Sequence, residues 1–477
     1  RQVTVVLSRR EDPIIAIATA PGRGAVGMVR ISGKGLSDYL QALCHTSLQP
    51  RTARLVTIKD DLGGHIDQVL ALFFPAPHSY TGEDVVELQG HGGPVVLDML
   101  VKHCLDKAQQ TNSAGQPWLA HLRLAAPGEF TERAYLNHKM DLAQAEAVAD
   151  LIDANTRAAA LSASRSLEGV FSKKIQALLK EMIDIRMQIE ACLDFPEEDI
   201  EFIEQLQIKS KIQSIQSQAE EILANALQGK LLRDGLKLVI AGQPNAGKSS
   251  LLNALSGTQT AIVTSIEGTT RDVLTELVQI EGVPVHVLDT AGLRDADKAD
   301  EVEKIGIERA WEQIQQADVV LLLNDLSRVN QPAYVDRQVL LGQDIKKRMH
   351  ADAVLLEVDN KADVAQQAQP LRENVVCISA KTGLGIQALR EKILQAAGWR
   401  ADRSQDICSA RARHVLSLET MLHHVNQANE LLTQAHLNVD ILAEECRLAQ
   451  KELSDITGAF TNEDLLGEIF SRFCIGK

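Results

Sequence analysis

The strongest constraint on this chain is a phosphate-binding loop pattern that follows an apolar run. Residues 242–249 read GQPNAGKS, and residues 236–241 before them have the composition of a buried strand. Glycines let backbone N–H groups curl around phosphate oxygens, and the following helix directs its positive N-terminal end at them. Lys248 would reach the outer phosphates, and the Ser249 hydroxyl would ligate Mg²⁺. The pattern predicts a nucleotide-binding α/β domain, although this motif alone leaves open a glycine-rich turn between a strand and a helix.

Three further motifs, each at the end of an apolar run, indicate that the nucleotide carries guanine. DTAG at residues 289–292 offers an Asp that can hold the Mg²⁺ shell and a Gly whose N–H can meet a γ-phosphate. NKAD at residues 360–363 ends in Asp363, whose carboxylate can accept from the N1–H and 2-amino groups of guanine. SAK at residues 379–381 could contact the guanine O6 through its backbone. Because ligands bind at the carboxyl ends of strands in open α/β sheets, the order of these motifs predicts a GTPase domain.

The segment between the first two motifs resembles a nucleotide switch. GTTRD at residues 268–272 contains Thr270, the candidate for a threonine that binds Mg²⁺ only when a γ-phosphate is present. Leu293 stands directly after DTAG, where a glutamine often orients the attacking water. An apolar side chain cannot orient water, so hydrolysis must be organised in another way.

Composition excludes several classes of protein. The 477 residues leave room for about three domains. A formal net charge of −15 argues against a broad nucleic-acid groove, which needs a basic face. The seven cysteines are scattered without a CxxC pair, and no HExxH is present, so neither a zinc site nor a disulfide framework is indicated. Without an apolar run of membrane-span length or a visible signal peptide, we expect a cytoplasmic protein with no membrane association.

The hydrophobic pattern predicts an α+β part, then helices, then the GTPase domain, then helices again. The first part has strand candidates at residues 14–18, 27–31, 69–74 and 85–88, and helix candidates at residues 36–44 and 95–108. The helical parts show apolar residues at helix spacing, which we interpret as the seams of a bundle: Leu142, Ala145, Ala149 and Ile152; Leu418, Met421, Leu422, Val425, Ala428 and Leu432; Leu442, Cys446, Ala449 and Leu453. The GTPase domain is therefore expected as an insertion into one helical domain, with limits at 1–137, 138–233, 234–398 and 399–477.

Motifs outside the GTPase domain point to one family. The chain reads APGRG at 20–24, RISG at 30–33, YTGED at 80–84, ELQGHGG at 87–93, PGEF at 127–130 and FCIGK at 473–477. Together with the GTPase motifs, they closely resemble the MnmE (TrmE) family of tRNA-modification GTPases over nearly the whole chain. The resemblance implies a folate-binding N-terminal domain that pairs in a homodimer, and a helical domain interrupted by a Ras-like P-loop GTPase domain.

The resemblance also implies an activity with a partner. With the flavoprotein MnmG, such proteins place an aminomethyl or carboxymethylaminomethyl group on C5 of the wobble uridine of certain tRNAs. The one-carbon unit comes from a tetrahydrofolate derivative, either 5-formyl- or methylene-tetrahydrofolate.

Family positions for folate and for the reactive thiol fall on named residues. Arg30, Glu87, Lys139 and Lys477 occupy the folate-contacting positions, and Cys474 occupies that of the cysteine on which modification depends. Arg30 and the lysines suit the folate carboxylates, and Glu87 can accept from the N–H edge of the pterin. The residues alone leave open an ordinary surface ion pair for each. A lone thiol becomes reactive only when its pKa is lowered.

For GTP hydrolysis the resemblance implies a bound K⁺ in place of an arginine finger. Its ligand positions fall on Asn245, Thr264, Ile266 and Thr269, and Glu303 matches the glutamate that orients the attacking water through a second water. The residues alone also allow a loop-shaping role for Asn245 and a helix-surface position for Glu303. The full nucleotide-binding set expected is Asn245, Ala246, Gly247, Lys248, Ser249, Ser250, Thr264, Ser265, Ile266, Glu267, Gly268, Thr269, Thr270, Asp289, Thr290, Ala291, Gly292, Asn360, Lys361, Asp363, Ser379, Ala380 and Lys381, with Ser249 and Thr270 on Mg²⁺.

The chain departs from the family pattern in a few places. Residues 1–13 have no counterpart, which leaves a transit segment open, although two acids at its end count against one. The loop at 294–300 is longer than is common, so the register of Glu303 is less firmly placed than that of Asp289. Gln243 and the pair Asn324-Asp325 are also atypical.

A second interpretation keeps the GTPase domain and changes the function. RNA-binding ribosome-assembly GTPases of the Era or EngA type share GTTRD-like switches. They usually carry a basic RNA-binding module after the GTPase domain, whereas the C-terminal block here is helical and acidic. A membrane-remodelling GTPase is remote, because the chain offers neither a membrane segment nor a basic amphipathic helix.

Overall fold

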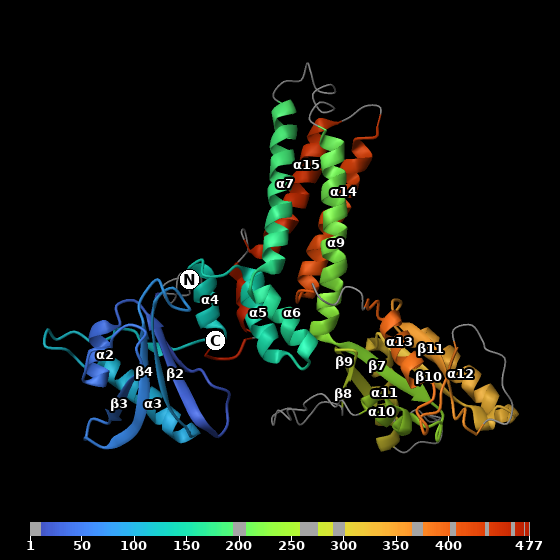
Figure 1. The fold of residues 1–477 in the computed structure, drawn as a ribbon, viewed down its shortest axis with the longest axis horizontal. Helices are drawn as coiled ribbons and strands as arrows, with labels where there is room; N and C mark the ends of the chain where they lie inside the picture. The colour runs from blue at the N-terminus through green and yellow to red at the C-terminus, as the bar shows by residue number, and fades with distance from the viewer. Residues whose placement is uncertain are drawn as a thin grey trace. The chain divides into compact units, whose positions relative to one another are not determined.

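The computed structural model describes residues 11–193, 207–257, 275–289, 301–364, 375–400, 407–434, 438–458, 463–471 and 473–476. The chain divides into two compact units (Figure 1). One combines Arg1–Ala149 with Ser454–Lys477, and the other is Asp150–Leu453. The N-terminal and C-terminal ends of the chain therefore belong to the same unit.

The first unit is built on a six-stranded sheet. Its strands, in spatial order, are β3 (Arg54–Lys59), β4 (His65–Phe74), β5 (Asp84–Gly92), β2 (Gly24–Gly33), β1 (Ile14–Ile17) and β6 (Arg123–Leu124). Neighbouring strands are antiparallel except β1 and β6, which are parallel. In β4 buried and more exposed residues alternate, because successive side chains point to opposite faces of a sheet. The register of β2 and β5 sets Arg30 directly opposite Glu87.

Two helices, α2 (Ser37–Cys44) and α3 (Pro94–Gln109), share one hydrophobic core with this sheet. Helix α3 begins with Pro94, whose fixed φ and missing N–H suit the first helical turn. A second cluster joins the start of α5 (Leu142–Asp153) to α16 (Glu463–Ser471) through Leu142, Leu466 and Phe470. Helix α4 (Glu129–Leu136) packs against α16, so the C-terminal segment is part of the first unit.

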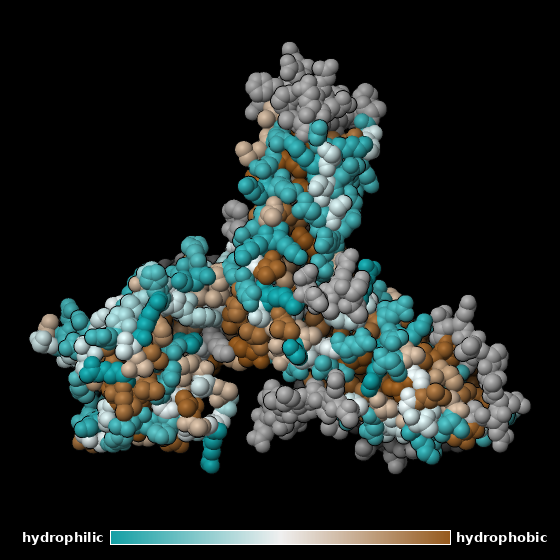
Figure 2. All heavy atoms as spheres, in the orientation of Figure 1, coloured by the Kyte–Doolittle hydropathy of each residue, from teal (hydrophilic) through white to brown (hydrophobic). Residues whose placement is uncertain are grey.

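The second unit combines helices with an α/β region. Its helices, called the helical region below, are α6 (Arg157–Leu167), α7 (Val170–Leu193), α9 (Ile208–Asp234), α14 (Ala412–Leu431) and α15 (Val439–Thr457), whose last residues belong to the first unit. Figure 1 shows α7, α9, α14 and α15 as a bundle. Hydrophilic side chains dominate the face of this bundle that is visible in Figure 2, while apolar residues such as Leu418, Met421 and Leu442 are buried.

The α/β region (residues 236–400) holds a six-stranded sheet in the order β12-β11-β10-β7-β9-β8. The strands are β7 (Leu236–Gly242), β8 (Thr275–Ile280), β9 (Val283–Asp289), β10 (Val319–Asp325), β11 (Val354–Asn360) and β12 (Val375–Cys377). All neighbours are parallel except β8 and β9. The remaining elements are α10 (Lys248–Ser256), α11 (Glu301–Gln316), η2 (Leu326–Arg328), α12 (Pro332–Arg348) and α13 (Ile386–Ala396).

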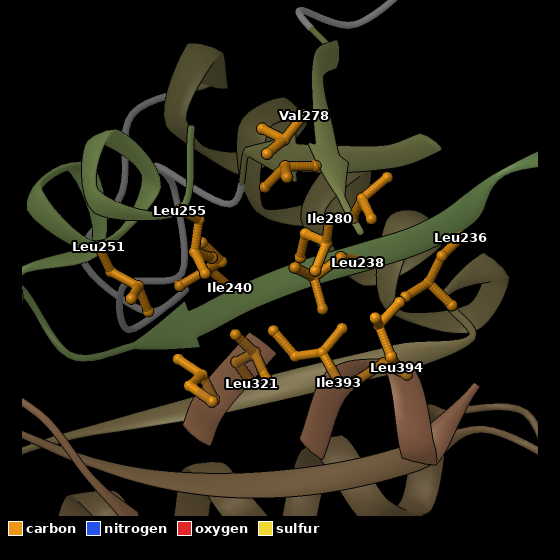
Figure 3. Close-up of a cluster of buried hydrophobic side chains, with 14 of the residues drawn as sticks. Leu236, Leu238, Ile240, Leu251, Leu255, Val278, Ile280, Leu321, Ile393 and Leu394 are labelled. Carbon is orange, nitrogen blue, oxygen red and sulfur yellow. The ribbon is translucent and has the colours of Figure 1, made fainter. Parts of the chain in front are cut away.

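The core of the α/β region explains why its motifs meet. Leu236, Leu238 and Ile240 of the central strand β7 pack with Leu321 of β10 and with residues of α13 (Figure 3). Strand β7 lies between β10 and β9 and runs parallel to both. Because these strands are parallel, the loops after β7, β9, β10 and β11 leave the sheet at the same edge.

The fold class expected from the sequence is confirmed: an α+β N-terminal part, a helical part and a P-loop GTPase-type α/β region. Each predicted strand and helix of the first part coincides with an observed element, but β3, β6 and α4 were not predicted. The prediction that Ile152 lies in a bundle seam is wrong, since its side chain is 46% exposed near the end of α5. The four domain limits stay a prediction.

Candidate functional site

The predicted phosphate-binding loop connects β7 to α10. Asn245 and Gly247 both adopt the left-handed backbone region, with φ of 63° and 97°. Glycine is required at 247, because a Cβ there would collide with the side-chain amide of Asn360. Lys248 is the first residue of α10, and its Nζ donates to the carbonyl of Gly242 at 2.8 Å. Ser249 and Ser250 are exposed at the start of the helix, where N–H groups have no intrahelical partner.

Asn360 joins three of the predicted motifs. Its side chain is buried at the end of β11, and its Nδ2 donates to the carbonyl of Ala246 at 2.8 Å. Its Oδ1 accepts from the backbone N–H of Ala380 at 3.0 Å. Beside it, the hydroxyl of Ser379 donates to Oδ1 of Asp363 at 2.7 Å. The structure therefore brings the phosphate loop, the NKAD motif and the SAK motif together.

Lys361 is held by an ion pair with the end of β10. Its Nζ lies 2.7 Å from Oδ2 of Asp325, a carboxylate that is 1% exposed. Burial by itself raises the pKa of Asp325, but hydrogen bonds from Lys361 and Ser327 outweigh that effect and hold its pKa below the ordinary aspartate value. The carboxylate thus stays ionised and fixes the side chain of Lys361 within the NKAD motif.

A buried polar network behind the phosphate loop was not predicted. Gln243 Nε2 donates to Gln338 Oε1 at 3.0 Å, and Gln338 Nε2 donates to Asn324 Oδ1 at 2.7 Å. Asn324 Nδ2 in turn donates to Asp359 Oδ1 at 2.9 Å. The atypical residues Gln243 and Asn324 thus support each other through α12. The spacing of Tyr334, Gln338 and Ile345 on one helix face was the signal that could have placed Gln338 inside.

Several predicted nucleotide and metal residues lie outside the described part of the chain. Strand β9 ends at Asp289, whose backbone is paired with Ile240 of β7, so the DTAG motif begins beside the phosphate loop. Glu303 belongs to α11. The side chains of both are not described, and the following predicted residues are not described at all: Thr264, Ser265, Ile266, Glu267, Gly268, Thr269, Thr270, Thr290, Ala291, Gly292 and Lys477. Their roles stay predictions.

A second candidate site lies on the sheet of the first unit, around Arg30 and Glu87. Nε and Nη2 of Arg30 donate to Oε1 of Glu87 at 3.0 and 2.8 Å. Both side chains are partly buried, at 15% and 17% exposure. The guanidinium also lies over the rings of Tyr80 and Phe130, at 5.6 and 5.7 Å from their centroids. An exposed surface ion pair, the alternative left open by the sequence, does not describe this arrangement.

The C-terminal segment reaches the same site. Nη1 of Arg30 donates to the carbonyl of Gly476 at 3.4 Å, and the N–H of Gly128 donates to the carbonyl of Cys474 at 3.4 Å. Gly128 has φ of 69°, and a Cβ there would lie 2.6 Å from the carbonyl of Phe470. The glycine of the PGEF motif therefore lets the C-terminal segment approach. Cys474 is exposed.

Lys139 lies beside the loop that carries Tyr80. Its Nζ donates to the carbonyl of Pro77 at 3.0 Å and is exposed, so the amine remains accessible to solvent. The same loop contains Gly82, where a Cβ would come within 3.4 Å of the Lys139 side chain. Arg30 and Lys139 thus flank one loop, residues 77–82.

Glu129 holds the surrounding elements in place. It accepts from Arg123 Nη2 at 2.7 Å, from Arg133 Nη2 at 2.8 Å and from the N–H of Ala126 at 2.8 Å. Burial alone raises the pKa of Glu129, but these donors outweigh it and lower its pKa below the ordinary value. Arg133 also donates to Glu83 at 3.0 Å, and Glu83 accepts from Ser32 at 2.7 Å. Tyr80, Phe130 and Glu129, all within motifs noted in the sequence, were not predicted as site residues.

The described residues offer neither a cluster of metal-binding side chains nor a membrane-spanning helix. Among them, no group of three or more His, Cys, Asp or Glu side chains is placed to hold a metal ion. None of their helices is long and apolar enough to cross a membrane.

Comparison with known proteins adds two family matches. Residues 13–139 match the model of the GTP-binding protein TrmE N-terminus, and residues 142–474 match the model of the MnmE helical domain. The second match begins before the α/β region and ends after it.

Curated relatives match the chain along its length. It is 53% identical to a tRNA modification GTPase MnmE from Polaromonas sp. strain JS666, over 99% of this chain and 100% of the relative. The protein of the same name from Methylibium petroleiphilum is also 53% identical, with the same coverage. Among solved structures, Era from Aquifex aeolicus is 25% identical over 42% of this chain and 68% of its own, with a TM-score of 0.27.

Proposed function

Because the chain belongs to the MnmE family of tRNA-modification GTPases, we propose that it uses GTP hydrolysis to drive modification of C5 of the wobble uridine in certain tRNAs. The group added is an aminomethyl or carboxymethylaminomethyl group. The flavoprotein MnmG is the partner, and a tetrahydrofolate derivative supplies the one-carbon unit. The protein acts in the cytoplasm as a homodimer.

The proposed GTP site is the edge of the α/β sheet where Ala246, Asn360 and Ala380 meet. Backbone N–H groups of residues 245–249 and Lys248 bind the phosphates, and Asp363 accepts from the guanine edge. Lys361, fixed by Asp325, packs beside the base. Glu303 orients the attacking water through a second water.

Ser249 and Asn245 are the proposed metal ligands that lie in the described part of the chain. A hydroxyl oxygen is a hard ligand of the kind Mg²⁺ prefers, and Ser249 is exposed at the start of α10 where the outer phosphates would lie. Asn245 is exposed in the same loop, so its side-chain oxygen is available to K⁺. The other proposed K⁺ ligands, Thr264, Ile266 and Thr269, lie outside the described residues. Bound there, the two cations would neutralise charge that develops on the phosphates. Thr270 completes the Mg²⁺ set.

The observation that carries the proposal is the meeting of Arg30, Glu87 and the C-terminal segment in one unit. A folate needs a carboxylate for the N–H edge of its pterin and cations for its own carboxylates. Glu87, oriented by Arg30, supplies the first, and Arg30, Lys139 and Lys477 supply the second. The same segment carries Cys474, the thiol on which modification depends in this proposal.

The test is mass spectrometry of tRNA nucleosides from a strain that lacks the gene. We expect C5-aminomethyl-type wobble uridines to disappear and to return when the gene is restored. A restored Cys474→Ser gene should leave them absent, and one that restored them fully would refute the role of this thiol. Unchanged nucleosides in the deletion strain would instead favour a ribosome-assembly GTPase of the Era or EngA type, which co-sedimentation with ribosomal subunits only in the GTP state would establish.

A further inference from the structure

Asp150 of α5 binds both chain segments that connect the α/β region to the helical region. Its Oδ1 accepts from Arg233 Nε at 2.8 Å and from Arg411 Nη2 at 2.8 Å, and its Oδ2 accepts from Ser409 Oγ at 2.7 Å. Arg233 lies at the end of α9, three residues before β7 begins at Leu236. Ser409 and Arg411 precede α14, on the return from the α/β region. One carboxylate, 6% exposed, therefore joins the entry and the exit of the α/β region.

The return segment is fixed on both sides as well. Its Ser409 backbone donates to the carbonyl of Ser162 at 3.2 Å and accepts from Ser166 Oγ at 3.0 Å, both on α6. On α9 a Cβ at Gly229 would collide with the carbonyl of Cys408, so only glycine lets the segment lie against the helix. The segment at 407–411 thus has little freedom to move without α6 and α9.

A small polar cavity extends this cluster to the α/β sheet. Its volume is about 100 Å³, and Asp150, Ser162, Arg233 and Ser409 line it together with His286 of β9. The hydroxyl of Ser162 is buried and has no hydrogen-bond partner among the described residues. Burial lowers the pKa of His286, so its ring is neutral at pH 7. His286 is three residues before Asp289, the start of the DTAG motif.

We propose that Asp150 is a positioning residue that transmits the nucleotide-dependent state of the α/β region to the helical region, and so couples GTP hydrolysis to tRNA modification. A carboxylate that binds two guanidinium groups and a hydroxyl fixes the relative position of their backbones. Without it, Arg233 and Arg411 lose the carboxylate that they share, and the entry and exit segments lose this direct connection. This inference rests on the proposed function, in which hydrolysis drives a reaction elsewhere in the protein.

The experiment compares Asp150→Asn with the full-length wild-type protein, together with MnmG and tRNA. We expect kcat for GTP to stay within about twofold, while modified uridine formed per GTP hydrolysed falls at least about tenfold, within the usual range for allosteric coupling. Arg411→Gln should give a loss in the same direction, and the double variant should lose less than the sum of the two single variants, because both changes break the contact between Asp150 and Arg411. Asp184→Asn, at an exposed site on α7 of the helical region, is the control and should match wild type.

Amide hydrogen exchange gives a readout that needs no tRNA. In the wild-type protein, GDP with aluminium fluoride should alter exchange in α9 and α14 as well as in the α/β region; in Asp150→Asn the change should stop at the α/β region. If Asp150→Asn does not fold, Ser409→Ala removes one hydrogen bond to the carboxylate without stranding a charge and should show a smaller loss in the same direction.

The outcomes separate the two proposals. Wild-type protein that modifies no tRNA would refute the proposed function, whereas the exchange experiment would still test Asp150. An Asp150→Asn protein with wild-type modification per GTP and wild-type exchange would overturn the inference.

Discussion

At the scale of single residues, Asn360 is the buried amide on which the nucleotide site depends. It connects the phosphate loop at Ala246 with the SAK motif at Ala380. Substituting alanine leaves both backbone groups without this partner, at a cost of about 1–3 kcal/mol. We expect Asn360→Ala to weaken GDP binding by roughly 10- to 100-fold, measured by isothermal titration calorimetry. Gln387→Ala, at an exposed site on α13, should bind GDP as wild type does.

Glu129 provides a prediction about pH. Burial raises its pKa, but Arg123, the Ala126 N–H and Arg133 together outweigh burial and lower the folded-state pKa, so the ionised form stabilises the fold. That stabilisation is fully present above the ordinary glutamate value of 4.5 and is lost as the pH falls through the lower folded value. Glu129→Gln should therefore lower Tm at pH 7, and the difference from wild type should shrink in scans below pH ~4. A difference that grew on acidification would contradict this assignment.

At the scale of helices, we expect a glycine-to-alanine substitution to have opposite effects on Tm at two positions. Alanine in a helix interior is normally about 1 kcal/mol more stable than glycine. Gly467 in α16 has open space where a Cβ would stand, so Gly467→Ala should raise Tm. At Gly229 in α9 a Cβ would meet the backbone of Cys408, and this overpacking costs about 1–3 kcal/mol. Gly229→Ala should therefore lower Tm, and a rise in both variants would show that the 407–411 segment yields easily.

At the scale of the whole molecule, the end of the chain belongs to the same unit as its beginning. The carbonyl of Gly476 accepts from Arg30, which orients Glu87. Deleting residues 474–477 should raise the Kd for 5-formyl-tetrahydrofolate at least about tenfold, the equivalent of ~1.4 kcal/mol, measured by calorimetry. GTP hydrolysis, which belongs to the other unit, should keep its kcat. Ile475→Ala is the matched control, since this side chain is 61% exposed and should leave folate binding unchanged.

The sequence by itself predicted most elements of the first part and the strand ends at which the nucleotide motifs begin. Hydrophobic runs end at Gly242, Asp289 and Asn360, and the parallel sheet brings these ends to one edge, as the pattern predicted. These signals are local, because strand runs, glycine turns and helix spacing depend on neighbouring residues. The family motifs likewise singled out Arg30 and Glu87.

Only the tertiary structure decided which polar residues meet across the fold. Asp150, Arg233 and Arg411 are far apart in the chain, and nothing local distinguishes them from solvated charges. The network of Gln243, Gln338 and Asn324 depends in the same way on packing of α12 against the sheet. The prediction that Ile152 lies in a bundle seam was wrong, because a periodic apolar stripe does not show where a helix stops packing against its neighbours. Such contacts depend on the packing of distant elements, which a local pattern cannot specify.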